Sequence, residues 1–483
     1  MKSILELKPK KVYEFFNDIS KIPHGSGNTD KLADYCVEFA KNKGLKVVKD
    51  SIGNVIIYSD GSKGFENSEP VILQGHLDMV CEKDPDIEFD FEKDAINVIT
   101  DGEFVWADKT TLGADNGIAI AYILAILDSD DIAHPPIEAL FTTDEETGMF
   151  GAAALDGNLF TSKRLINIDS EEEGVLTVSC AGGVNATCYL PFNYKEVSKD
   201  SVFYKLSISS LVGGHSGIEI HKNRKNAIKE VGRMLDYISS SVHINICDIS
   251  GGNKINAIPR KCEAVICVNS NESDKFLELF NEFKDTFTKE CANCEPDIAF
   301  ECVKIEKQKI VLDDDSSKTL VFALTHIYNG VETMNPKIPD MVETSLNLGI
   351  CEFKDNSMVL SFLVRSNSST GKDLLTQKLT SFVEYLGGRV ELDVDYSAWE
   401  YKAESPLRDV FVEVYKSIYN NEPEIASIHA GLECGMFSGI LKDTDMISFG
   451  PNLEKVHTTE ERMDVASVER TWNYLLKFLE NLK

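Results

Sequence analysis

The first 182 residues alternate between helical and strand-like patterns of apolar positions. Apolar residues spaced by three and four predict an amphipathic helix within residues 1–23, and an almost wholly apolar run over 116–127 predicts a core helix. Short apolar runs bounded by polar turns predict strands over residues 46–58, 71–80, 136–146 and 165–171. This order is typical of an α/β domain with a mixed, largely parallel sheet, which binds ligands at the carboxyl ends of its strands.

The pattern changes in the middle of the chain and then returns. Residues 264–283 and 360–382 both run from an apolar strand through a polar Asn/Ser turn into an amphipathic helix, which suggests an inserted, duplicated α+β domain. The α/β pattern resumes over residues 405–419, 445–451 and 465–482. We therefore expect a catalytic domain made of residues 1–183 and 394–483, with a lid domain over residues 184–393.

Length, composition and net charge limit the classes of protein to which the chain can belong. A chain of 483 residues with 43% hydrophobic and 27% charged residues is typical of a soluble globular protein of two or three domains. Its longest purely apolar stretch, Gly117–Leu127, falls short of the roughly 20 residues of a membrane span. Scattered cysteines and the absence of a signal-peptide pattern favour the cytoplasm. A net charge of −30 argues against a nucleic acid partner and favours cations.

Five stretches place His, Asp or Glu where a predicted strand ends: "GHLDMV", "LGADNG", "TTDEETG", "NIDSEE" and "KVHTTEER". Each stretch alone could equally be a core histidine, a helix cap or a solvated loop. Together they would gather carboxylates at one sheet edge, where cations must offset the repulsion. Two sites with one histidine and one carboxylate each, plus a shared carboxylate, favour zinc, with manganese or cobalt as alternatives.

The ordered set "GHLDMV", "ADNGIA", "TDEETG", "NIDSE", "GGHSG" and "HTTEE" resembles the co-catalytic two-metal peptidases, and most closely the aminoacyl-histidine dipeptidases, also called cytosol non-specific dipeptidases. The resemblance spans residues 76 to 461. It implies that His76 and Asp169 bind one ion, that Glu146 and His457 bind the other, and that Asp115 bridges the two. It also implies a cis peptide bond after Asp115.

Two further carboxylates have expected roles near these ligands. Asp78 shares a strand face with His76, so we expect it to accept the second ring N–H of that histidine and orient the ring. Neighbouring side chains on an extended segment point apart, so Glu146 would face a metal while Glu145 stays free to take a proton from the attacking water.

The resemblance places the remaining site residues in the lid and near the C-terminus. His215, which follows two glycines, would polarise the scissile carbonyl, from its own chain or across a dimer. Arg365 and Asn256 would bind the substrate carboxylate, for which the fork of an arginine is suited. In the stretch "HAGLECGMF", Gly431 would contribute a backbone contact and Glu433 would bind a free amine.

These residues predict a dipeptidase that hydrolyses Xaa-His or a broader range of dipeptides by attack of a metal-activated water, acting as a monomer or homodimer. One alternative is an N-acyl-amino-acid deacylase with the same two-metal centre, which would lack an acidic group for a free amine. Another is a non-catalytic metal-binding relative, which would need neither Glu145 nor His215. A nicotinamide-dependent dehydrogenase with a Rossmann fold is a poorer alternative, because no GxGxxG motif opens a helix.

Overall fold

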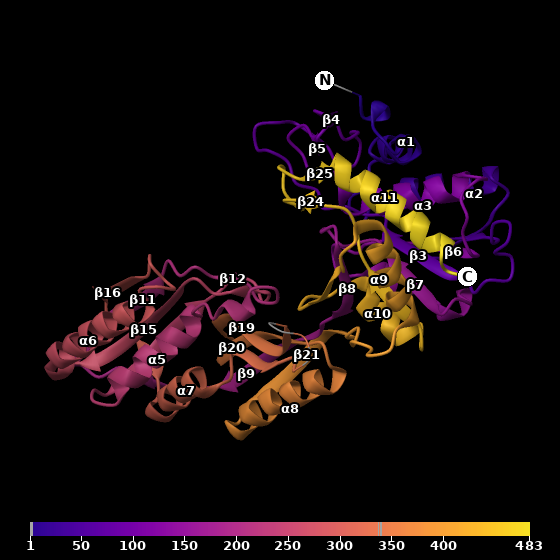
Figure 1. Ribbon diagram of the computed structural model, residues 1–483. Coiled ribbons are helices and arrows are strands. Elements are labelled where there is room, and N and C mark those ends of the chain that lie inside the picture. Colours follow the sequence, from indigo (N-terminus) through magenta and orange to yellow (C-terminus); the bar gives the residue numbers. More distant parts are fainter. Residues whose placement is uncertain (1–2, 337, 339–340) are drawn as a thin grey trace. The chain divides into compact units, whose positions relative to one another are not determined.

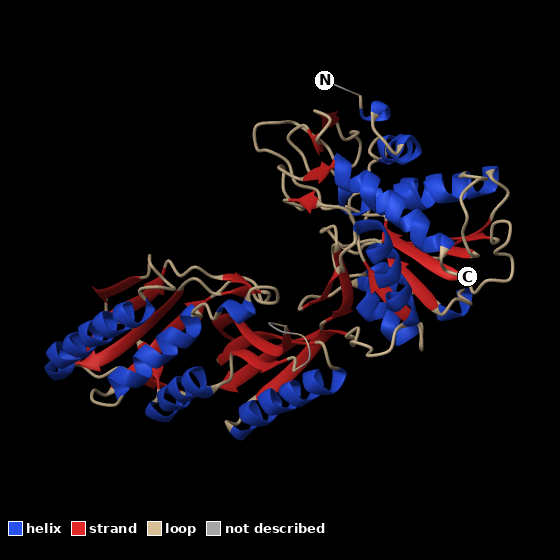
Figure 2. Ribbon diagram, in the orientation of Figure 1, coloured by secondary structure: helices blue, strands red, loops and turns tan. Residues whose placement is uncertain are grey.

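The computed structural model describes residues 3–336, 338 and 341–483. The chain divides into two compact units. The first unit comprises Met1–Cys180, Tyr401–Ser427 and Leu432–Lys483. The second comprises Ala181–Glu400 and Ile428–Gly431. Figure 1 follows the chain through both units, and Figure 2 shows their helices and strands.

An eight-stranded mixed sheet forms the centre of the first unit, in the order β1-β2-β6-β3-β7-β23-β8-β22. The central neighbours β6, β3, β7 and β23 pair in parallel, and β1, β2 and β8 pair antiparallel. These strands span Lys46–Lys49 (β1), Val55–Ser59 (β2), Val71–His76 (β3), Ile137–Thr142 (β6), Arg164–Asn167 (β7), Val175–Cys180 (β8), Glu424–Ile428 (β22) and Asp445–Ser448 (β23). A four-stranded sheet adds Val98–Thr100 (β4), Phe104–Ala107 (β5), Leu453–Glu454 (β24) and Arg462–Asp464 (β25).

Helix α3, Ala114–Asp128, is the core helix of this unit. Asn116 and every residue from Gly117 to Leu127 are buried, because the helix packs between strand β3 and helix α1 and is apolar on all sides. The other helical segments are Ile4–Glu6 (η1), Lys10–Ile19 (α1), Asp30–Asn42 (α2), Phe150–Ala153 (α4), Gly157–Leu159 (η2), Pro406–Tyr419 (α9), Glu433–Ile440 (α10) and Val465–Glu480 (α11).

A nine-stranded sheet forms the second unit, in the order β16-β11-β15-β13-β19-β20-β9-β21, with β18 beside β19. Alternate residues of its strands, such as Met358, Leu360, Phe362 and Val364 of β20, join one apolar core with helices α5 to α8, as the period of two in a strand requires. The strands are Gly182–Pro191 (β9), Ser201–Ser209 (β11), Ile244–Gly251 (β13), Cys262–Asn269 (β15), Ala299–Ile305 (β16), Gly330–Met334 (β18), Val342–Lys354 (β19), Ser357–Ser366 (β20) and Arg389–Tyr396 (β21).

Helices and short strands complete this unit. The helical segments are Ile220–Lys222 (η3), Ala227–Ser239 (α5), Ser270–Glu272 (η4), Ser273–Cys291 (α6), Asp314–His326 (α7) and Ser369–Tyr385 (α8). Two-stranded sheets pair β10 (Tyr194–Glu196) with β17 (Ile310–Leu312), and β12 (Gly214–His215) with β14 (Ala257–Ile258).

The fold class expected from the sequence is confirmed, whereas the internal duplication stays a prediction. The observed units differ from the expected domains at their edges. Residues 181–183 and 394–400, expected in the catalytic domain, belong to the second unit, the latter because strand β21 continues pairing with β9 as far as Tyr396. The short segment Ile428–Gly431 also belongs to the second unit.

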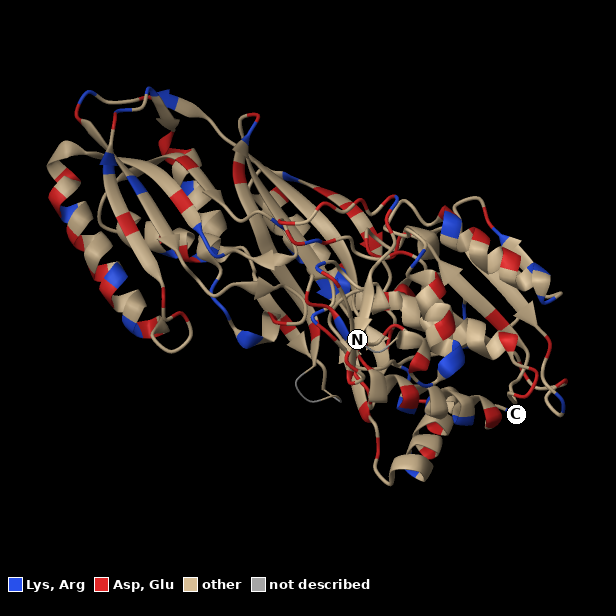
Figure 3. Cartoon of the chain, turned by 90° about the horizontal axis from the view of Figure 1, so that it is seen from above, with Lys and Arg blue, Asp and Glu red and all other residues tan. Residues whose placement is uncertain are grey.

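Charged side chains are spread over helices and loops of both units, and many of them are acidic (Figure 3). Within the ranges that the structure describes, no helix combines the length and apolar character needed to cross a membrane.

Candidate active site

The parallel strands of the first unit place the candidate metal ligands at one edge of the sheet. His76 is the last residue of β3, Glu146 follows the end of β6, and Asp169 follows the end of β7. Because these strands are parallel neighbours, their carboxyl ends lie together. Asp115 lies in the first turn of α3, and His457 lies in the loop between β24 and β25.

Asp115 connects the two histidines through its two carboxylate oxygens. Its Oδ1 lies 3.1 Å from His76 Nε2, and its Oδ2 lies 3.1 Å from His457 Nε2. Asp169 Oδ1 is 3.4 Å from His76 Nε2, and Glu146 Oε1 is 2.9 Å from His457 Nε2. The five side chains therefore form two groups, each with one histidine and one carboxylate, that share Asp115.

The electrostatics of this cluster fit divalent cations. Burial alone would raise the pKa of Asp115, but hydrogen bonds from His457 and His76 lower it. Hydrogen bonds to Asp115 and Glu146 raise the pKa of His457 to about 11. The histidine nitrogens thus lie against carboxylate oxygens whose negative charge requires a cation, and this donor set suits zinc.

Ligand atoms of three of these residues lie within 4.8 Å of one another, namely those of His76, Asp115 and Glu146. This spacing allows one ion to contact all three. Together with Asp169 and His457, the cluster could hold two ions. The peptide bond between Asp115 and Asn116 is cis, as the resemblance implied.

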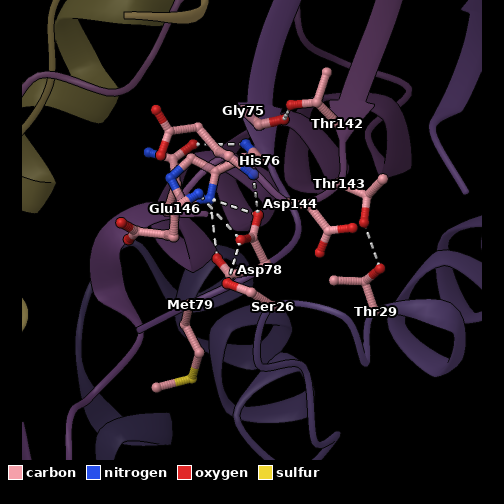
Figure 4. Close-up of polar contacts among 12 residues, drawn as sticks. Ser26, Thr29, Gly75, His76, Asp78, Met79, Thr142, Thr143, Asp144 and Glu146 are labelled. Atoms are coloured by element: carbon pink, nitrogen blue, oxygen red, sulfur yellow. Dashed lines mark hydrogen bonds and ion pairs between the residues drawn. The ribbon is translucent and has the colours of Figure 1, made fainter. Parts of the chain in front are cut away.

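Asp78 contacts the His76 ring, as expected, and has further partners. The Nδ1 atom of His76 lies 2.9 Å from the carbonyl oxygen of Asp78 and 3.4 Å from its carboxylate. The carboxylate also accepts hydrogen bonds from the backbone N–H groups of Glu145 (2.9 Å) and Glu146 (3.2 Å) and from Ser26 Oγ (2.7 Å). Figure 4 shows Asp78 beside His76, Ser26 and Glu146. Asp78 therefore contacts the His76 ring with its carbonyl and its carboxylate, and its side chain also holds the Glu145–Glu146 backbone in place.

Glu145 is partly exposed and makes no ion pair with a lysine or arginine among the described residues. Burial, with the nearby carboxylates Asp169 and Glu433, raises the pKa of Glu145 well above its usual range. A carboxylate with a raised pKa is a stronger base, so Glu145 is suited to accept a proton.

Two buried residues that we did not predict from the sequence connect the ligand-bearing segments. The Oδ1 atom of Asn116 accepts the backbone N–H of His76 (3.1 Å), and its Nδ2 donates to the carbonyl of Ile168 (2.7 Å). Glu461 accepts three backbone N–H groups just before Asp115. The only sequence signals were their positions inside "ADNG" and "HTTEE", which do not reveal contacts so distant along the chain.

His215 lies in strand β12 of the second unit, and its ring has a defined tautomer. Its Nδ1 accepts the backbone N–H groups of Gly217 and Ile218, both at 3.2 Å. Burial, with the positive charge of Arg365, lowers the pKa of His215. The neutral ring must therefore carry its proton on Nε2, which makes that atom a hydrogen-bond donor.

The other expected substrate-binding residues of the second unit have different environments. Arg365, at the end of β20, is 6% exposed and donates from Nη1 to the hydroxyl of Tyr396 (3.1 Å). Its buried Nε has no hydrogen-bond partner among the residues that the structure describes. Asn256 is exposed, and its carbonyl oxygen accepts the N–H of Ser216. Gly431 lies in the short segment 428–431.

Glu433 does not fit the role expected for it. Its side chain is completely buried in the first unit, and its Oε2 accepts hydrogen bonds from Gln74 (2.5 Å) and Thr142 (2.8 Å). Burial raises the pKa of Glu433 to about 8. A carboxyl group without exposed surface cannot contact a substrate amine in this conformation, so we do not assign that role to Glu433.

Comparisons with known proteins identify the family of the chain. The chain is 38% identical to the cytosol non-specific dipeptidase of Escherichia coli (strain K12) over 482 residues, which cover 100% of this chain and 99% of that protein. Aminoacylhistidine dipeptidase from Vibrio alginolyticus matches with a TM-score of 0.93 and 36% identity, covering 99% of this chain and 98% of that one. Aminopeptidase PepT from Bacillus cereus, at 14% identity and a TM-score of 0.58 with 99% of both chains covered, shows the same fold. The model of peptidase family M20/M25/M40 matches residues 72–481, and the chain therefore belongs to that family.

Proposed function

We propose that the chain is a metal-dependent dipeptidase that binds two divalent ions, zinc or alternatively cobalt or manganese. The observation that carries the proposal is the placement of one Asp115 oxygen beside each of two histidines. The names of the E. coli and Vibrio relatives, both dipeptidases, support the substrate class.

In this proposal His76, Asp169 and Asp115 hold one ion, and His457, Glu146 and Asp115 hold the other. When bound, the ions lower the pKa of a water molecule and polarise the peptide carbonyl. The first unit is the catalytic domain and the second is the lid domain. Asp78 keeps Glu145 in position by accepting its backbone N–H.

Side chains of the protein transfer the proton and bind the substrate. Glu145 accepts a proton from the attacking water and passes it to the nitrogen of the leaving amine. His215 donates its Nε2–H to the carbonyl oxygen as negative charge develops there. Arg365 binds the terminal carboxylate of the substrate, for which the planar fork of its guanidinium is suited. Asn256 and a backbone group of Gly431 complete the substrate contacts.

The expected substrates are Xaa-His or a broader range of dipeptides, and the expected location is the cytosol, where the name of the E. coli relative places that protein. A monomer and a homodimer are both compatible with the proposal, the latter allowing His215 to act across subunits. We expect no nucleic acid or membrane partner.

A substrate panel tests the proposal against an N-acyl-amino-acid deacylase, a possibility strengthened by the burial of Glu433. We expect kcat/KM to be highest for free dipeptides and to fall at least tenfold when the amino group of the same dipeptides is acetylated. Initial rates on matched pairs, such as β-alanyl-histidine and its N-acetyl form, measure this ratio. Preference for the acetylated members would favour the deacylase, and no hydrolysis of either would favour a non-catalytic relative.

Changing Arg365 to alanine tests how the carboxylate is bound. We expect kcat/KM on dipeptides to fall about 10²-fold, the cost of losing a charge-assisted pair of about 3 kcal/mol. The loss should be much smaller on the same dipeptides amidated at the C-terminus, which have no carboxylate. His215→Ala is the matched comparison, because it should lower kcat equally on both substrates. Equal losses in the Arg365→Ala variant would make this arginine a structural residue.

A further inference from the structure

Glu461 occupies an unusual position between two loops that carry candidate metal ligands. It follows His457 by four residues, and its side chain is only 3% exposed. One carboxylate oxygen accepts the backbone N–H groups of Leu112 (2.7 Å) and Gly113 (3.2 Å), and the other accepts that of Ala114 (2.9 Å). All three donors directly precede Asp115. One carboxylate thus links the loop of His457 to the backbone that leads into Asp115.

The start of helix α3 needs such an acceptor. The residue before the helix is Gly113, with φ of 72°, so it has no side chain that could cap the first N–H groups. Glu461 provides the missing acceptor from a distant part of the chain, and its negative charge suits the positive end of the helix dipole. Within the described residues, the polar contacts of the Glu461 carboxylate are these three N–H groups.

The loop that carries His457 is held by few contacts of its own. The side chain of His457 is 47% exposed, and its backbone has a positive φ of 62°, which is uncommon for a residue with a side chain. Little packing therefore holds this histidine. The backbone N–H of Glu461 donates to the carbonyl oxygen of Thr458 (3.1 Å). This hydrogen bond forms a turn next to the buried carboxylate of Glu461.

We infer that Glu461 is a positioning residue that sets the separation of His457 and Asp115, and so determines how tightly the ions bind. This inference rests on the metal centre proposed above. Glu461 would not contact the ions or the substrate. It holds the backbones from which Asp115 Oδ2 and His457 Nε2 approach each other to 3.1 Å. Residues that orient metal ligands commonly contribute 10- to 100-fold to metal affinity.

Glu461→Gln is the test variant, because it keeps the size of the side chain but turns one acceptor into an NH₂ group facing N–H donors. Glu460→Gln is the matched control, because Glu460 is exposed on the same loop and forms an ion pair with Lys455 (2.9 Å). We expect the dissociation constant for zinc, measured by competition with a chromophoric chelator, to rise about 10- to 100-fold in Glu461→Gln and to stay within about twofold in Glu460→Gln.

Amide hydrogen exchange of the metal-free protein provides a second readout that needs neither metal nor activity. The amides of Leu112, Gly113 and Ala114 should be protected in the unmodified chain and in Glu460→Gln, and should exchange faster in Glu461→Gln. Equal zinc affinities in the two variants would overturn the inference, as would unprotected amides in the unmodified chain. Failure of the unmodified chain to bind zinc would instead overturn the proposed metal centre.

Discussion

Replacing Glu145 with glutamine is expected to reduce kcat by about 10²- to 10⁴-fold, the usual contribution of a general base. The amide of glutamine cannot accept the proton of the attacking water at neutral pH. The backbone N–H of residue 145 still donates to Asp78, so the loop should keep its conformation. The five candidate ligands are unchanged, so metal content measured by atomic emission should equal that of the unmodified chain.

A control variant and the metal content together show whether Glu145 acts as the base. The same Glu to Gln change at Glu172, an exposed residue in the loop after β7, should leave kcat within about twofold, as exposed substitutions usually do. If metal content fell in parallel with the rate in Glu145→Gln, Glu145 would be a metal ligand. The assignment of Glu145 as the base and Glu146 as the ligand would then be wrong.

The strand pattern explains why much of the metal cluster could be predicted. A parallel sheet brings the carboxyl ends of neighbouring strands together whatever the sequence distance between them. Residues placed at such ends, like His76 and Asp169, therefore meet once the strands are recognised. His457 could not be placed in this way, because it lies on a loop beyond β24, and only the ordered motifs suggested its role.

Side-chain contacts between distant segments could not be read from the sequence. Asp78 was expected to face His76 because residues two apart share a strand face. Its carboxylate does lie 3.4 Å from His76 Nδ1, but it also accepts the backbone N–H groups of Glu145 and Glu146, which no strand pattern predicts. Glu433 was expected to bind a free amine, but it begins helix α10 and is buried there against β3 and β6.

Removing divalent ions is expected to have the largest effect of all, the loss of measurable dipeptidase activity. The two ions would supply the activated water and much of the positive charge beside Asp115, Glu146 and Asp169. No side chain of the cluster can activate a water molecule in this way. The fold itself should persist, because protonated His76 and His457 can pair with the same carboxylates. Circular dichroism of the stripped protein checks this expectation.

The proposed two-ion centre is tested most directly by titrating chelator-stripped protein with zinc, cobalt or manganese and measuring the rate of dipeptide hydrolysis. We expect no measurable rate without metal and full recovery at about two equivalents per chain, as a centre with two ions requires. Full activity in protein shown by atomic emission to contain no metal would contradict this proposal.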